Sequence, residues 1–142
     1  MSSRAFLPLL VALAISATTC GGDSGDGGAP TGSTTAVTQA QADEAMGGLC
    51  EIAAGGLVEM ADVDEAFHGR AHDALHAVAA EAQEVDPVVA GALLEAKYVV
   101  ETDLEEATPP PDLPAHAGAL VVAFADALEA IGLQPARCAV PA

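Results

Sequence analysis

The stretch DVDEAFHGRAHDALHAVAAEAQEVDP, residues 62–87, decides the fold of this chain. Asp62 and Glu65 have the spacing of a capping box, which starts a helix. Apolar residues then recur every three or four positions, as on the buried face of an α-helix; they are Phe67, Ala71, Leu75, Val78 and Ala82. Asp86 is suited to cap the following helix, with Pro87 in its first position. The stretch therefore predicts one continuous helix that begins at Asp62 and stops before Asp86.

Another helix is predicted ahead of this stretch, from Thr38 to about Met60. Thr38 and Gln41 again have capping-box spacing. One face of this predicted helix carries Ala42, Met46, Leu49, Ala53 and Met60. The pairs 47–48 and 55–56 are glycines, and each glycine weakens a helix by about 1 kcal/mol relative to alanine. The alternative is therefore a helix that is kinked or split at one of these pairs.

Two more helices are predicted after the opening stretch. One runs from Pro87 to before the three prolines at 109–111, and the other spans 113–131 with Gly132 as its C-cap. Alanine, leucine and glutamate dominate, and no alternation of period two is sustained, so strands are not predicted. Short connections make neighbouring helices antiparallel. We therefore predict an all-α domain at 39–142, a small up-down four-helix bundle.

The N-terminal residues have the layout of a bacterial lipoprotein precursor. Arg4 precedes an apolar run of about 13 residues, shorter than the roughly 20 that span a bilayer. Small residues and Cys20 follow, and then a glycine-rich stretch typical of a flexible tether. We predict a lipoprotein signal peptide at 1–19, lipid attachment at Cys20 and a disordered tether over 20–38.

The residues just before the cysteine leave a second interpretation open. The lipobox motif prefers leucine three places before the cysteine and Gly, Ala or Ser immediately before it, whereas this chain has Ala17 and Thr19. An ordinary signal-peptidase cut after Ala17 is the competing interpretation. A lipoprotein would be held by its N-terminal lipid at the extracytoplasmic face of the bacterial cell membrane.

The three cysteines of the chain point to one disulfide. An odd number of cysteines in an exported protein leaves one without a partner, and lipid on Cys20 would remove that oddness. Cys50 and Cys138 are then predicted to pair in an oxidising compartment. Such a bond closes a loop of roughly 90 residues, worth about 4–5 kcal/mol in the chain-entropy model. Two buried free thiols are the alternative, and the absence of a CxxC motif disfavours a zinc site at these cysteines.

Charge excludes one class of partner. The chain has 21 Asp and Glu residues against 4 Lys and Arg residues, a formal net charge of −17. Such a surface repels nucleic acid and anionic lipid head groups. We therefore predict no nucleic-acid partner, and contact with the membrane through the lipid alone. The acidic surface keeps an alanine-rich protein soluble, and a metal ion or a cationic protein is the partner it would attract.

Three histidines spaced by four residues form the one constellation with chemical content. His68, His72 and His76 would lie one turn above another along a helix, and Glu65 lies on the same ridge. Two imidazoles at this spacing can bind one transition-metal ion. The ridge is expected to run from the edge of the core towards solvent, so a site here would lie at the surface or between helices.

Further ligands for such a site would come from elsewhere in the chain. His116, Glu101, Glu105 or a second copy of the protein could complete it. Neutral imidazoles and carboxylates suit Zn, Cu or Ni better than Mg or Ca. The alternatives are polar surface histidines that bind nothing, or a pH sensor, because clustered histidines become charged near pH ~6–7.

Catalysis finds little support in the sequence. The GxSxG, P-loop and HExxH motifs are absent, and no cysteine lies close in sequence to a histidine. The many carboxylates are expected on solvated helix faces. We therefore predict a binding or structural module and no enzyme.

Three stretches carry a resemblance to a known group of proteins. They are the tether Cys20-Gly-Gly-Asp-Ser-Gly, the segment AFHGRAHDALH at 66–76, and LEAK at 94–97. In an alanine-rich, acidic chain these stretches resemble the small secreted lipoproteins of high-GC actinobacteria. The resemblance implies a location in the cell envelope and a helical fold, and it implies no particular activity, cofactor or catalytic residue.

Overall fold

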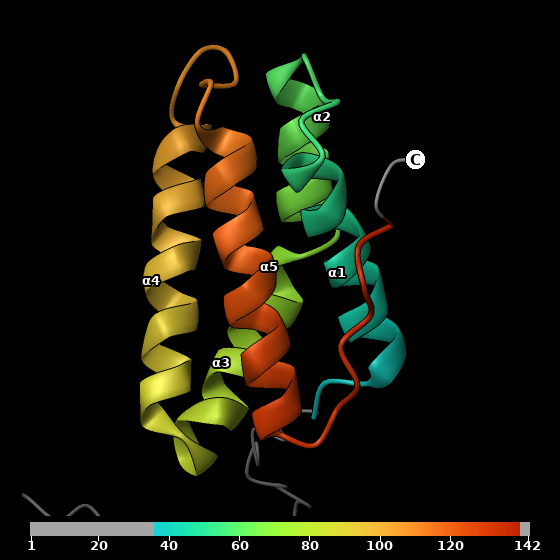
Figure 1. Cartoon of the computed structure of the whole chain (residues 1–142), viewed down its shortest axis with the longest axis vertical. Helices are drawn as coiled ribbons and strands as arrows, with labels where there is room; N and C mark the ends of the chain where they lie inside the picture. The colour runs from blue at the N-terminus through green and yellow to red at the C-terminus, as the bar shows by residue number, and fades with distance from the viewer. Residues whose placement is uncertain (1–35, 140–142) are drawn as a thin grey trace, which may run out of the picture. The chain divides into compact units, whose positions relative to one another are not determined.

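The computed structural model describes residues 36–139, and every regular element in that range is a helix (Figure 1). The elements are α1 (Gln39–Ala53), α2 (Met60–Asp64), the π-helical turn η1 (Glu65–Gly69), α3 (His72–Val85), α4 (Pro87–Leu104) and α5 (Leu113–Ala130). The all-α prediction is confirmed for these residues. The predicted signal peptide, Cys20 and most of the predicted tether lie outside the described residues.

Two helices start at the residues that local capping signals predict. The Thr38 hydroxyl accepts a hydrogen bond from the Gln41 N–H, and the Gln41 side chain accepts one from the Thr38 N–H at 3.0 Å. Asp86 caps α4 by accepting hydrogen bonds from the N–H groups of Val88 and Val89, with a proline in the first turn. Each cap satisfies amide groups that a helix start leaves without a partner.

The predicted C-terminal end of the first helix is wrong. The helix ends at Ala53 instead of continuing to Met60. Gly55 follows with a φ of +70°, in the left-handed region that glycine adopts without steric cost. The chain turns there, and Met60 begins the separate helix α2. Of the alternatives that the glycine pairs left open, a split at the second pair is the one observed.

The second predicted helix is interrupted, so its prediction as one continuous element is wrong. The capping box of Asp62 and Glu65 does not form, because the cap position of α2 is Glu59, whose side chain makes no cap hydrogen bond. After α2 the chain forms the π turn η1, and α3 begins only at His72. In the described residues the chain thus has five α-helices and a π turn where four helices were predicted.

The spacing of buried residues accounts for this interruption. Val63, Phe67, Ala71 and Leu75 are all fully buried and follow one another at intervals of four. In a regular α-helix each such interval turns the side chain by about 40°, so three intervals would carry Leu75 roughly 120° away from Val63. A π turn holds more residues per turn and absorbs this drift. All four side chains consequently stay on the core side.

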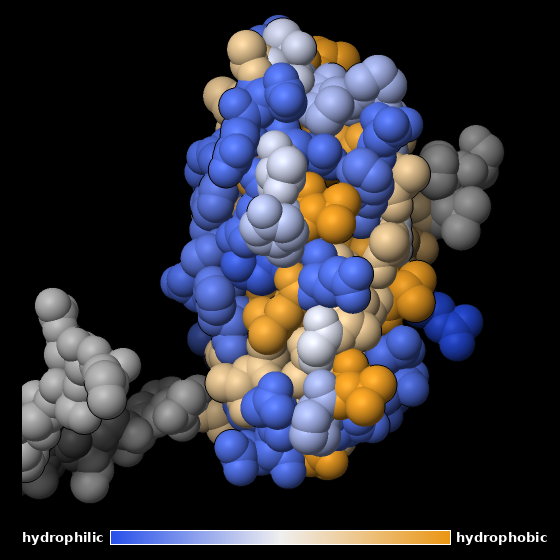
Figure 2. Space-filling view, turned by 90° about the vertical axis from the view of Figure 1, so that its left-hand side faces the viewer, coloured by the Kyte–Doolittle hydropathy of each residue, from blue (hydrophilic) through white to orange (hydrophobic). Residues whose placement is uncertain are grey.

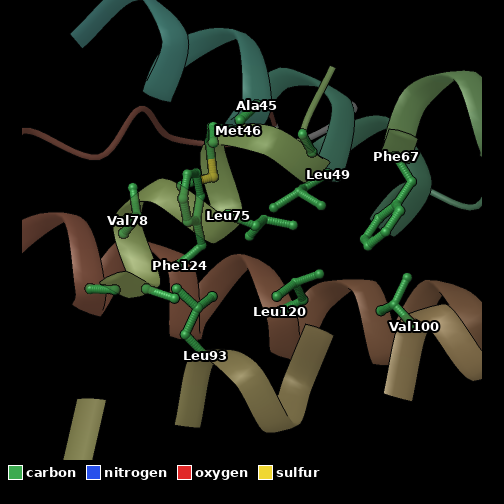
Figure 3. Packing of buried hydrophobic residues seen from close by; sticks show 14 of the residues in the cluster. Ala45, Met46, Leu49, Phe67, Leu75, Val78, Leu93, Val100, Leu120 and Phe124 are labelled. Atoms are coloured by element: carbon green, nitrogen blue, oxygen red, sulfur yellow. The ribbon is translucent and has the colours of Figure 1, made fainter. Parts of the chain in front are cut away.

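The helix α5 lies at the centre of the packing. It contacts α1, α3 and α4, and Figure 3 shows Leu120 and Phe124 of α5 directed toward Met46, Leu49 and Leu75. All five side chains are fully buried. Within residues 36–139, α5 is also the helix whose length and composition alone would allow it to cross a membrane. The buried stripe of this helix, a third of its residues, accounts for part of that apolar composition.

The end of α5 confirms the predicted C-cap. Gly132 has a φ of +84°, and the N–H of Leu133 donates to the carbonyl of Leu128 at 2.8 Å. This is the hydrogen bond of a Schellman motif, which needs a left-handed residue at the position after the cap. The chain then reverses direction and leaves the helix.

The C-terminal segment after α5 runs back along α1 (Figure 1). Gln39 Nε2 donates to the carbonyl of Gln134 at 2.7 Å, and the Gln134 N–H donates to Gln39 Oε1 at 3.1 Å. Farther along, a disulfide joins Cys138 to Cys50, with Cα atoms 5.3 Å apart. The predicted pair of cysteines is therefore bonded, and the alternative of two free thiols does not hold in the structure.

The folded part of the chain begins before the predicted boundary at residue 39. Val37 is buried in the core, and its N–H donates to Glu81 Oε1 at 2.7 Å. This bond ties the residues just ahead of α1 to α3. The last residues of the predicted tether thus belong to the domain.

The helix α4 carries a mixed outer surface. Figure 2 shows the side of the molecule on which α4 lies, with apolar patches among mostly hydrophilic side chains. Four large apolar side chains of this helix are exposed, namely Val88, Leu94, Tyr98 and Val99. Scattered exposure of this kind is ordinary on protein surfaces.

Two adjacent glycines of α1 are expected to respond in opposite ways to alanine. A Cβ at Gly48 would lie 2.4 Å from the carbonyl oxygen of Ala66, whereas a Cβ at Gly47 would meet nothing within 4 Å. We expect Gly48→Ala to lower the free energy of unfolding by about 1–3 kcal/mol through overpacking against η1. The matched control Gly47→Ala should raise it by up to about 1 kcal/mol through helix propensity. Urea unfolding would measure both, and equal shifts would contradict the close approach of α1 to η1.

Candidate metal centre

Three side chains from three different elements converge at one end of α3. They are His68 of η1, His72 of α3 and Glu101 of α4, and each offers a donor atom within 4.8 Å of the others. A zinc ion bound at about 2.0–2.2 Å holds its donors roughly 3.5 Å apart, so small side-chain rotations would close the group. The three residues could therefore hold a metal ion.

A continuous stack of aromatic rings positions the two histidines. The buried ring of Phe67 packs edge-on against His68 at 5.1 Å and against His72 at 6.0 Å between ring centroids. The rings of His68 and His72 are 5.2 Å apart, and the ring of His76 continues the stack at 4.6 Å from His72. Because Phe67 is fixed in the core, the stack ties the orientation of both imidazoles to core packing.

A carboxylate on α2 fixes the orientation of His68. Asp64 Oδ1 lies 2.7 Å from His68 Nδ1, one turn earlier in the chain. When the imidazole is neutral, its Nδ1–H donates to this carboxylate and the lone pair is on Nε2. Metal-binding histidines commonly donate their second ring nitrogen to a carboxylate in this way. The spacing of four between the two residues is a signal from which the sequence could have suggested Asp64.

Glu101 is held between a lysine and a histidine. Lys97 Nζ donates to Glu101 Oε1 at 2.5 Å, and the same oxygen lies 3.5 Å from His72 Nε2. His72 is the most covered of the three ridge histidines, with 29% of its side chain exposed against 44% for His68. The predicted course of the ridge from the edge of the core towards solvent is therefore wrong for the step from His68 to His72, because the helix is interrupted between η1 and α3.

The charges at this site act on Glu101, a candidate ligand, and on His76, which packs beside the group. Burial lowers the pKa of His76 below its usual value of 6.5, and the nearby Lys97 and His72 lower it further, against the opposing effect of Glu101 and Asp73. Desolvation acts to raise the pKa of Glu101, yet the hydrogen bond and charge of Lys97 hold it below its usual range. The lowered pKa of Glu101 favours the ionised carboxylate, which is the form that binds metals.

The remaining residues predicted as ligands do not join the group. His76 packs on His72 but offers no donor atom within it, and the Glu65 carboxylate lies over Gly69, where an added Cβ would be 2.5 Å from Glu65 Oε1. His116 is engaged elsewhere, with Nδ1 2.7 Å from Asp103 Oδ2. The predicted ridge of histidines with Glu65 is thus corrected to a group in which Glu101 supplies the carboxylate.

A hollow of about 380 Å³ gives access to part of the group. It is lined by residues of α2, η1 and α4, namely Asp64, His68, Tyr98, Glu101, Thr102, Leu104 and Glu105. Glu105, which the sequence suggested as a further ligand, lies on the wall of this hollow and outside the group of three. An ion could therefore reach His68 and Glu101 directly from solvent.

Comparisons with protein-family models, with curated proteins and with solved structures gave no match to this chain.

Proposed function

We propose that this chain is a lipid-anchored module of the bacterial cell envelope whose helical domain binds one divalent transition-metal ion and performs no catalysis. The observation that carries the proposal is the convergence of His68, His72 and Glu101 within 4.8 Å of one another. They come from separate elements of the domain, for which we propose the topology of an up-down four-helix bundle. Two imidazoles with one carboxylate favour Zn, Cu or Ni over Mg and Ca.

The arrangement around the three residues supports this proposal. Asp64 orients His68, the fixed ring of Phe67 packs on both imidazoles, and a lowered pKa keeps Glu101 ionised. Outer partners of this kind are what metal sites use to orient their ligands.

The proposed location rests on the N-terminal sequence together with the disulfide. The signal-like run, Cys20 and the glycine-rich tether are typical of lipoprotein precursors, as in the actinobacterial lipoproteins that the chain resembles. The bond between Cys50 and Cys138 is consistent with an oxidising compartment. Mass spectrometry of the mature N-terminus tests the anchor: a diacylated Cys20 is expected, and an unmodified chain that begins at Thr18 would contradict it.

Titration calorimetry with Zn, Cu and Ni tests the metal site. The chain from residue 20, with Cys20→Ser to keep it free of lipid, is expected to bind at least one of these ions with a dissociation constant below about 100 μM. Loss of an outer partner typically weakens a metal site by about 10–100-fold, so His72→Ala and Glu101→Gln, which remove ligands, should weaken binding by about 100-fold or more. Asp64→Asn should weaken it by about 10–100-fold.

Two histidines provide matched controls. His116→Ala should leave the affinity unchanged, because this residue pairs with Asp103. His76→Ala should have a small effect, because it offers no ligand in the group. Binding that survives His72→Ala, or that is lost equally with His116→Ala, would show that the three residues do not form the site.

A further inference from the structure

Lys97 carries its charge in buried surroundings directly beside the candidate ligands. Its side chain is the one buried charged group among residues 36–139, and the residue is only 5% exposed. Its ammonium donates to Glu101 Oε1, the oxygen that faces His72. A buried charge is stable only when it is paired. Glu101 is therefore the counter-ion of Lys97 as well as a candidate metal ligand.

A metal ion at this site would compete with Lys97 for the carboxylate of Glu101. An ion bound by His72 and Glu101 would share the same carboxylate with the ammonium, and the two positive charges would repel each other strongly at such short range. We infer that Lys97 is an internal cation that neutralises Glu101 when no metal is bound, and that metal binding displaces the ammonium from Glu101 Oε1. This inference rests on the proposed function and adds the residue that sets the affinity of the site.

The competition also bears on which ions can bind. The free energy that an ion gains on binding must exceed the free energy that is lost when the ammonium leaves the carboxylate. Zn, Cu and Ni gain from both imidazoles in addition to the carboxylate, whereas Mg and Ca prefer oxygen ligands and gain little from imidazole. Displacement of Lys97 therefore lowers the affinity of every ion by the same factor, and the two imidazoles decide which ions still bind.

Removal of the lysine charge tests the inference directly. Zinc titration of Lys97→Met, in the chain from residue 20 with Cys20→Ser, is expected to show an affinity about tenfold or more above that of the same chain with Lys97. Arg137→Met is the matched control, because it removes one positive charge from the C-terminal segment, next to the disulfide, and should leave the affinity unchanged. If Lys97→Met does not fold by circular dichroism, Lys97→Gln keeps a neutral donor for Glu101 and should act in the same direction.

The single lysine of the sequence allows a second measurement. An amine-reactive reagent should modify Lys97 slowly in the metal-free protein, because the side chain is buried and paired. Saturating zinc should raise the rate of modification at this residue, as followed by peptide mass spectrometry. An unchanged or slower rate with zinc bound would show that the ammonium stays on Glu101.

The outcomes separate this inference from the proposed function. If the native site binds zinc and Lys97→Met does not strengthen binding, the inference is wrong and the metal site stands. If neither protein binds Zn, Cu or Ni, the proposed function fails and the inference with it. Binding by Lys97→Met alone would contradict metal binding by the native chain and support the lysine as the competing cation.

Discussion

Replacement of both Cys50 and Cys138 by serine is expected to lower the free energy of unfolding by about 4–5 kcal/mol. The bond joins residues separated by 88 positions, so it removes a large amount of chain entropy from the unfolded state. Small domains have total stabilities of about 5–15 kcal/mol. The double variant should therefore be marginally stable, with a strongly lowered midpoint in guanidinium chloride.

The measurement is best made in a Cys20→Ser background, where the paired cysteines are the only ones left. Reduction of the parent protein should give the same loss of stability as the double serine variant. A stabilisation below about 1 kcal/mol would mean that the native bond carries strain or that the reduced unfolded chain keeps structure.

Two phenylalanine variants should lose similar stability and differ in metal binding. Phe67 and Phe124 are both fully buried, and removal of such a ring typically costs about 3–5 kcal/mol. Only Phe67 packs against His68 and His72. Phe67→Ala should therefore also weaken zinc binding by about 10-fold or more, as loss of an outer partner does, whereas Phe124→Ala should leave the affinity of the folded protein unchanged.

The comparison requires conditions in which both variants remain folded. With the disulfide intact and at low temperature, circular dichroism defines the folded fraction before each titration. Equal zinc affinities for the two variants would show that the ring stack does not position the histidines. Phe67→Leu, which keeps most of the buried volume, should recover most of the stability and little of the orientation.

Local signals in the sequence predicted the ends of several helices correctly. The caps at Thr38, Asp86 and Gly132 depend on hydrogen bonds between near neighbours, which a sequence displays directly. The π turn was not predictable in the same way. The π turn keeps Phe67 and Leu75 on the same side of the core. It also lies close to Gly48 of α1, a helix that is distant in the sequence.

Local sequence patterns likewise predicted only part of the candidate site. The spacing of His68 and His72 was visible within one segment, and both residues belong to the group. The carboxylate of the group comes from the pairing of α3 with α4, so Glu101 was only one of several candidates in the sequence, and Glu65 of the predicted ridge does not join the group. The burial of Lys97 arises from that same packing, and no local pattern in the sequence marks it.

The disulfide also changes what a single cut in the backbone can do. Cys50 lies near the end of α1 and Cys138 near the end of the chain, so they enclose every described helix after α1 in one covalent ring. A protease that nicks the exposed stretch between α4 and α5 opens this ring without separating its pieces. If the chain is held through Cys20 as proposed, α5 and the C-terminal segment would remain attached to the membrane after such a cut. For cuts inside the ring, release of α5 would then need two cuts, or one cut and a reductant.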